Sequence, residues 1–407
     1  MNSKYKVNPY RPGAGLKPTY LAGRDESIED VSHMFDDLVH HVPTQSVIGT
    51  GLRGVGKTVW LNKLEEQASI KGVCCRHLEV ETRKDFIAQI ADASQKFLIE
   101  VSASAKAKHL LSKALTAIKC LSISFNPDDN TFSLSAQDRE LFKSNSLSQS
   151  LTDVFVAIGE AAEAADKPLC FFIDEMQYMK NEELGSLVSA LHRVNQLGYP
   201  VMMVGTGLPK TYKLLAEERT YAERLFVYHK IKPLTRDEAE KAVVEPAKKC
   251  GFEYTPEAIN KIVTMTKGYP FFIQQFCQIV YDKNTAPIID LEAVNDSIQD
   301  YLKRLDDGFF KIRYERCSAS EKQFIFAMAQ SGKDFCEMQD IAMRLNKPEN
   351  SISTIRAQLI NKGVICVKKQ KLAFTVPDFD RFLKRLPEYH VWNNRHRNEL
   401  VPNDEIR

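Results

Sequence analysis

Apolar and polar positions over the first 234 residues follow two alternating patterns. Helical spacing of apolar side chains, as at Ile28, Val31 and Phe35, predicts amphipathic helices. Short continuous apolar runs predict strands of a parallel sheet, because helices cover such strands on both faces. These runs lie at residues 46–50, 73–80, 169–173, 200–204 and 225–231. Strands that alternate with helices predict a three-layer α/β core domain over residues 1–234.

The segment 101–150 interrupts this alternation. Its first part is rich in Ala, Lys and Ser but keeps an apolar stripe at Leu110, Leu111 and Leu115, which predicts a helix. Apolar and polar residues then alternate at 121–125 and 131–135, on either side of Asn, Pro and Asp residues. This alternation predicts a β-hairpin inserted into the core domain.

Strand patterns stop at Thr235, and helical patterns at 236–250, 256–267 and 270–284 predict a small helical domain over 235–312. The next 77 residues predict three helices and then two short alternating runs at 364–367 and 372–376. Three helices followed by a two-stranded hairpin is the plan of a winged-helix domain, which we expect over 313–389. We expect residues 390–407 to form a loose polar tail.

The composition limits the classes of function. Hydrophobic residues make up 43% and charged residues 27%, and no apolar run is long enough to span a membrane, so we expect a cytoplasmic protein without membrane contact. The cysteines show no zinc-like spacing, which favours reduced thiols. The net charge of +2 excludes a polycation, so any surface for nucleic acid must be local.

Residues 51–58 read GLRGVGKT and fit the phosphate-binding loop pattern G-x-x-x-x-G-K-[ST] between a predicted strand and a predicted helix. Glycines let backbone N–H groups surround phosphate, and the helix N-terminus adds its positive dipole end. The motif predicts that Lys57 contacts the β- and γ-phosphates of ATP and that Thr58 ligates Mg²⁺. The expected nucleotide-binding residues of the loop are Gly51, Gly54, Val55, Gly56, Lys57, Thr58 and Val59.

Two further predicted strands end in polar residues. Asp174 and Glu175 follow a buried run, as in a Walker B motif, where the aspartate holds Mg²⁺ and the glutamate polarises the attacking water. Thr206 follows the next buried run and suits a sensor of the attacking water or γ-phosphate. A turn residue between Gly205 and Gly207 is the alternative for Thr206.

Arg219 and Arg224 lie in a charged, helix-like stretch after the Thr206 strand. An arginine that reaches the γ-phosphate of a neighbouring subunit stabilises developing charge, so Arg224, and less readily Arg219, is a candidate arginine finger. Surface ion pairs that contribute little are the alternative. The finger hypothesis implies a homo-oligomer or a partner protein.

The sequence resembles the AAA+/STAND branch of P-loop ATPases, and most of all ATPases related to the origin-recognition initiators. The segments that carry this resemblance are residues 20–25, the P-loop, Ile173–Glu175, Gly205–Gly207 and the closing winged helix. This resemblance implies a P-loop ATPase core, a lid domain that closes over the nucleotide, and positions for Gly23 and Arg24 near the adenine.

One stretch departs from the initiators. Those proteins carry an arginine on the lid helix that senses the γ-phosphate, whereas residues 268–272 here read GYPFF. This stretch resembles the G-x-P motif of STAND ATPases, which implies that Pro270 lies against the nucleotide. The resemblance therefore implies tightly bound and slowly hydrolysed ATP.

The predicted winged helix allows two hypotheses. In the first, it binds double-stranded DNA, because small polar residues and arginine can read base edges and wing lysines can contact phosphates. In the second, the protein is a STAND-like signalling or scaffold ATPase, in defence for example, whose winged helix contacts protein. Candidate DNA-contacting residues are Ser353, Thr354, Arg356, Gln358, Lys362, Lys368, Lys369, Lys371, Arg381, Lys384 and Arg385.

Overall fold

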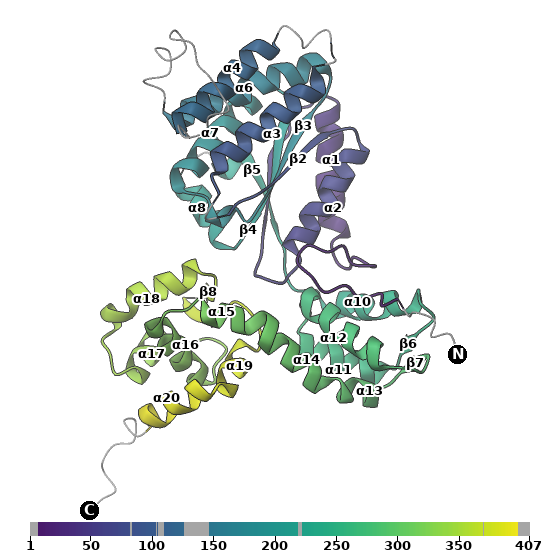
Figure 1. Cartoon of the computed structure of the whole chain (residues 1–407), viewed down its shortest axis with the longest axis vertical. Helices are drawn as coiled ribbons and strands as arrows, with labels where there is room; N and C mark the ends of the chain where they lie inside the picture. The colour runs from purple at the N-terminus through teal and green to yellow at the C-terminus, as the bar shows by residue number, and fades with distance from the viewer. Residues whose placement is uncertain are drawn as a thin grey trace, which may run out of the picture.

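The computed structural model describes residues 7–81, 84–102, 104, 110–125, 146–218, 222–368 and 370–397. An α/β part lies at the top of Figure 1, and two helical parts lie side by side beneath it. The first of these follows the α/β part in the chain and the second contains the C-terminal helices. We call them the lid and the C-terminal part.

A five-stranded parallel sheet forms the centre of the α/β part, in the order β2-β3-β4-β1-β5. All five strands predicted from apolar runs are confirmed. The two central strands β3 and β4 are buried along their whole length, as expected for strands covered on both faces. The strands are β1 (Ser46–Thr50), β2 (Cys74–Glu79), β3 (Leu169–Asp174), β4 (Val201–Gly207) and β5 (Phe226–Lys230).

Helices cover both faces of this sheet (Figure 1). Consecutive residues of β3 point to opposite faces: the ring of Phe172 packs 6.2 Å from that of Phe35, and the ring of Phe171 stacks 5.3 Å from that of Phe155. One face packs on α1 (Asp25–Val39) and α2 (Lys57–Ile70). The other packs on α3 (Phe86–Val101), α6 (Leu147–Ala165), α7 (Asn181–Leu197) and α8 (Lys210–Glu218), and α4 (Leu111–Phe125) packs outside them on α3 and α6.

The predicted hairpin is wrong in its first strand, because residues 121–125 end helix α4. Ala114, Ile118 and Leu121 recur at helical spacing and are buried in the core shared with α3 and α6. The apolar positions of a five-residue run fit both a period of two and this helical stripe, and the helix buries more apolar surface. The predicted second strand, 131–135, lies outside the described residues.

The lid begins with a capping box, in which the Thr235 hydroxyl accepts from Glu238 N and the Glu238 carboxylate accepts from Thr235 N. The N-terminal segment crosses to this part, where the buried Tyr10 donates a hydrogen bond to the carbonyl of Val243. The lid elements are α10 (Arg236–Lys248), β6 (Glu253–Tyr254), α11 (Pro256–Thr266), α12 (Pro270–Lys283), β7 (Ile288–Ile289), α13 (Leu291–Asp296) and α14 (Ile298–Leu305).

A π-helical turn, η2 (Asp306–Phe310), and the short helix α15 (Lys311–Glu315) lead from α14 into the C-terminal part. The order of three helices followed by an antiparallel hairpin is the predicted one. These elements are α16 (Ala319–Ser331), α17 (Met338–Arg344), α18 (Glu349–Asn361), β8 (Ile365–Lys368) and β9 (Lys371–Phe374).

Two helices close the C-terminal part, α19 (Phe379–Arg385) and α20 (Pro387–Arg397). The prediction of a loose tail from residue 390 is therefore wrong for the residues up to 397. Tyr389 and Trp392 lie one helical turn apart and pack their rings on Phe326, so this helix is held by two aromatic side chains within a polar sequence. Among the described helices, none has the length and apolar character that a membrane crossing requires.

Candidate nucleotide-binding site

A cavity of about 320 Å³ opens at the carboxyl end of the sheet. The P-loop and Glu175 line it from the α/β part, and Pro270, Phe271 and Gln274 line it from the lid. The N-terminal segment 11–22 and two residues near α15, Phe309 and Arg313, complete the wall. Regions far apart in the sequence therefore enclose one site.

The P-loop turns into α2 through two glycines in the left-handed region, Gly54 (φ 82°) and Gly56 (φ 91°), where a side chain would be strained. Gly56 is the N-cap of α2, so the helix N-terminus opens into the cavity. The buried Lys57 ammonium donates to the carbonyl of Leu52 at 3.2 Å. Burial lowers the pKa of Lys57, and the nearby Glu175 and Asp174 carboxylates partly offset that effect.

Asp174 lies behind the P-loop and is hydrogen-bonded from both sides. The Thr58 hydroxyl donates to one carboxylate oxygen at 2.6 Å. The buried Thr206 hydroxyl and, at 2.7 Å, the backbone N–H of Glu175 donate to the other oxygen. Predicted residues from the P-loop, β3 and β4 thus meet at one carboxylate.

The donor set at this point suits Mg²⁺. Within the described ranges, no three His, Cys, Asp or Glu side chains are grouped so as to hold a metal ion. Mg²⁺ is commonly bound by one or two protein oxygens and completes its octahedron with water and substrate phosphates. The Thr58 hydroxyl and the Asp174 carboxylate, side by side next to the cavity, provide two such oxygens.

Glu175 lines the cavity in a left-handed backbone conformation (φ 57°) just after β3. Its carboxylate accepts a hydrogen bond from the side-chain amide of Gln177. The amide oxygen of Gln177 in turn accepts from Leu208 N at 2.8 Å, which links Glu175 to the end of β4. The sequence analysis did not single out Gln177, because one glutamine in a short turn carries no recognisable signal.

Arg24 is placed beside the cavity but binds backbone. Its guanidinium donates to the carbonyls of Gly23 (2.7 Å), Val55 (3.0 Å) and Lys232 (2.7 Å), so it joins α1, the P-loop and the segment leading to the lid. Burial lowers the pKa of Arg24, and Glu238 opposes that effect. Arg24 therefore supports the shape of the site.

The structure brings most of the predicted residues to the cavity. Gly23 and Gly51 do not line it; an added Cβ would lie 2.4 Å from the Glu238 side chain at Gly23 and 2.3 Å from the carbonyl oxygen of Ile231 at Gly51. Both glycines therefore serve close packing. The predicted residues that do line the cavity are Arg24, Gly54, Val55, Gly56, Lys57, Thr58, Val59, Glu175 and Pro270.

The candidate arginine finger lies away from the cavity of its own chain. Arg224 is exposed on α9 (Ala222–Leu225), and its carbonyl accepts from the side-chain amide of Gln45 at 2.6 Å. Arg219 lies outside the described residues.

Arginines that the sequence analysis did not assign also line the cavity, among them Arg53 and Arg313. Arg53 occupies a variable position of the P-loop motif and donates to the Tyr178 hydroxyl at 2.5 Å. Arg313 comes from α15, 260 positions further along the chain, and its guanidinium lies 3.6 Å from the centre of the Phe309 ring. Only the folded arrangement could reveal this second arginine.

Comparisons with known proteins agree with this geometry. A family model described as an AAA ATPase domain matches residues 20–204, and one described as a domain of unknown function (DUF8462) matches residues 307–383. Comparison with curated proteins gives no match.

Solved structures share the fold. The Walker-type ATPase PABY2304 of Pyrococcus abyssi superposes with a TM-score of 0.56 at 14% identity, over 92% of this chain and 98% of that one. The ORC2 protein of Aeropyrum pernix in its ADP form superposes with a TM-score of 0.50 at 12% identity, over 96% and 98%. Residues 20–204, which contain the P-loop site, therefore match an AAA ATPase domain, and the chain shares the fold of the Walker-type ATPase PABY2304 and of the Aeropyrum pernix ORC2 protein.

Proposed function

We propose that the protein binds ATP with Mg²⁺, hydrolyses it slowly and acts as a molecular switch. The observation that carries this proposal is the meeting of Thr58, Asp174 and Thr206 beside a cavity lined by Lys57 and Glu175. Groups that bind phosphate, hold a metal ion and activate water need to converge in this way for phosphoryl transfer. Predicted residues from three separate motifs supply each of these groups.

Different residues of the chain would bind the phosphates, hold Mg²⁺ and activate water. Lys57 and the N–H groups at the start of α2 would bind the phosphates, and Thr58 and Asp174 would hold Mg²⁺. When bound, Mg²⁺ neutralises charge that develops on the phosphate oxygens. Glu175 would orient the attacking water and accept its proton. Slow turnover is expected, because the hydrogen bond from Gln177 already occupies one oxygen of the Glu175 carboxylate that would otherwise be free to bind water.

Contacts between the C-terminal part and the ATPase motifs support the switch. Lys210, just after β4, donates to the carbonyl of Asn361 at the end of α18 at 3.3 Å. An added Cβ at Gly363 would lie 2.9 Å from the Leu208 side chain and 3.3 Å from Nε of Arg53. The C-terminal part therefore contacts the P-loop and the end of β4. A change of the bound nucleotide would alter these contacts, because both segments lie at the nucleotide site.

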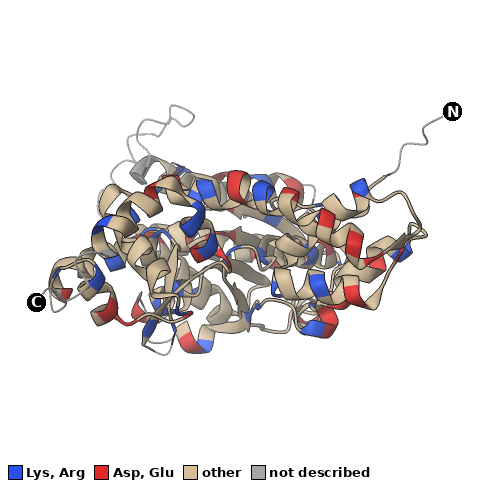
Figure 2. Cartoon of the chain, turned by 90° about the horizontal axis from the view of Figure 1, so that it is seen from below, with Lys and Arg blue, Asp and Glu red and all other residues tan. Residues whose placement is uncertain are grey.

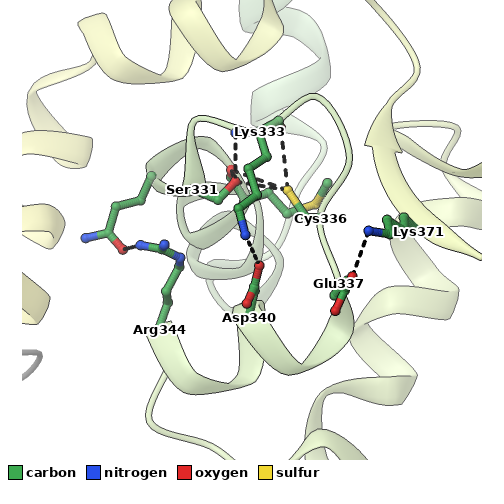
Figure 3. Close-up of polar contacts among 9 residues, drawn as sticks. Ser331, Lys333, Cys336, Glu337, Asp340, Arg344 and Lys371 are labelled. Carbon is green, nitrogen blue, oxygen red and sulfur yellow. Dashed lines mark hydrogen bonds and ion pairs between the residues drawn. The ribbon is translucent and has the colours of Figure 1, made fainter.

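These contacts favour the hypothesis that the proposed winged helix contacts protein, here its own ATPase part. Four of the candidate DNA-binding cations pair with carboxylates of the same chain, and Figure 3 shows one of these pairs, between the hairpin residue Lys371 and Glu337 (2.7 Å). Basic and acidic residues are interspersed in the view of Figure 2. The other three pairs are Lys362–Glu321 (2.6 Å), Arg381–Asp378 (3.4 Å) and Arg385–Asp306 (2.5 Å).

DNA binding is the second candidate function. Ser353, Thr354 and Gln358 are exposed on α18 and Lys368 is exposed on β8, so polar and basic groups remain for a duplex. Lys369 lies outside the described residues. The fold shared with an origin-recognition protein is compatible with this role.

One experiment separates the two candidates. Mass and hydrodynamic radius are measured by size-exclusion chromatography with light scattering in ADP, in a non-hydrolysable ATP analogue, and with added duplex DNA. For the switch we expect the analogue to increase the radius or the mass without DNA. The exposed Arg224 would then be tested as a finger between subunits. A co-eluting, salt-sensitive DNA complex with no response to nucleotide would contradict the switch.

A further inference from the structure

One arginine enters the cavity from beyond the lid helices. Helix α12, which begins at Pro270 beside the P-loop, contains no arginine among its residues 270–283. Arg313 on α15 lines the same cavity instead. We infer that Arg313 contacts the terminal phosphate of ATP and makes the site distinguish ATP from ADP. This inference rests on the proposed ATP-binding function.

An aromatic stack fixes the position of Arg313. Its guanidinium lies 3.6 Å from the centre of the Phe309 ring and donates to the Phe309 carbonyl at 2.5 Å. The Phe309 ring stacks on Phe271 of α12, with centroids 5.1 Å apart and planes 21° apart. An added Cβ at Gly54 would lie 3.7 Å from this same Phe309 ring. The stack therefore holds Arg313 next to the P-loop.

The neighbours of Arg313 show at which end of the cavity it lies. Arg53 and Tyr178 are both close enough to Arg313 to shift its pKa, in opposite directions. These two residues are joined by a 2.5 Å hydrogen bond, and Tyr178 stands three positions after Glu175. The guanidinium is thus at the Glu175 end of the site. In ATP hydrolysis that end must receive the terminal phosphate, because Glu175 activates the water that attacks it.

Within the part of the chain that the structure describes, the Arg313 guanidinium has no counter-ion. Of the described residues, no carboxylate forms an ion pair with Arg313 or Arg53, and the buried Nε of Arg313 has no hydrogen-bond partner. Burial, together with the positive charges of Arg53 and Arg316, lowers the pKa of Arg313 to about 9. A partly buried cation beside another cation is unfavourable unless an anion joins it. A phosphate group supplies that anion and the acceptors for the free N–H groups.

The alternative is a purely structural arginine that holds Phe309 in place. A structural role predicts equal effects on both nucleotides, whereas a terminal-phosphate contact predicts an effect on ATP alone. We therefore compare Arg313→Gln and Arg313→Lys with a matched control, Arg316→Gln, which changes an exposed arginine just after the same helix.

The experiment measures the Kd of ADP and of a non-hydrolysable ATP analogue, with Mg²⁺, by calorimetry on the full chain. We expect Arg313→Gln to weaken the affinity for the ATP analogue roughly 10- to 100-fold and to change the affinity for ADP by no more than about twofold. Arg313→Lys should weaken the analogue less, and Arg316→Gln should match the wild type. Equal weakening of both nucleotides, or no change in either, would overturn the assignment.

A second variant separates this inference from the proposed function. Lys57→Ala should weaken both nucleotides, because Lys57 reaches the β-phosphate as well. If Lys57→Ala weakens the affinity for both nucleotides and Arg313→Gln leaves the preference for ATP intact, only the role assigned to Arg313 is refuted. If Lys57→Ala changes the affinity for neither nucleotide, the assignment of the nucleotide site itself is refuted.

Discussion

Thr206→Val tests whether the end of β4 belongs to the catalytic centre. Valine has nearly the shape of threonine, so the change removes one hydroxyl from a fully buried position without opening a cavity. Asp174 then keeps the hydrogen bonds from Thr58 and from Glu175 N but loses the third donor. A hydrogen bond to a charged group contributes about 1.5–3 kcal/mol, so the free energy of unfolding should fall by about this amount.

The same loss should lower activity. Asp174 is the carboxylate proposed to hold Mg²⁺, and a free energy of about 1.5–3 kcal/mol corresponds to roughly a 10- to 100-fold change. We therefore expect ATP turnover to fall by roughly this factor in Thr206→Val. Steady-state phosphate release with saturating Mg²⁺ measures turnover, and urea unfolding followed by fluorescence measures stability.

A matched control lies five residues away. The Thr211 hydroxyl is equally buried, and among the described residues it has no hydrogen-bond partner. Thr211→Val should therefore leave stability unchanged or raise it slightly, and should leave turnover unchanged. Wild-type turnover in Thr206→Val, or an equal loss in Thr211→Val, would refute the role of the Thr206–Asp174 hydrogen bond.

Two further predictions address chemistry and DNA. Glu175→Gln should keep ATP binding but reduce hydrolysis by about 10²- to 10⁴-fold, since an amide cannot accept the proton of the attacking water; single-turnover assays measure this, and unchanged turnover would make Glu175 structural. If the hairpin binds duplex DNA, Lys368→Glu and Lys371→Glu should each reduce the salt slope of binding by about 0.9, measured over several salt concentrations. Equal slopes and affinities would leave these lysines without a DNA role.

The sheet could be predicted from the sequence because its signals are local. Residues 169–173 form an unbroken apolar run, and the structure buries each of them in a central strand between two layers of helices. The P-loop and the residues Asp174 and Thr206 could also be placed, since the carboxyl ends of neighbouring parallel strands meet at one edge. The P-loop, Asp174 and Thr206 lie close together because their strands are neighbours in the sheet.

Other parts depend on contacts distant in sequence. Leu121 fits an alternating strand pattern over five residues, and only its packing among α3 and α6 makes it helical. Arg313 reaches the cavity because the π-helical turn η2 and the Phe309–Phe271 stack carry α15 back to the P-loop. The pairing of Lys371 with Glu337 likewise joins the hairpin to the start of α17. No periodicity within one segment contains this information.

The most direct test of the central claim is the affinity for Mg²⁺-ATP of the wild type and of Lys57→Ala, measured by calorimetry on the full chain. Lys57 is buried beside the cavity and bonds only weakly to the Leu52 carbonyl, so its ammonium is available to a phosphate. We predict one bound nucleotide per chain for the wild type. For Lys57→Ala we predict a loss of affinity of roughly 100-fold or more with the fold retained. Equal affinity in the two proteins, or no binding to the wild type, would contradict an ATP site at the P-loop.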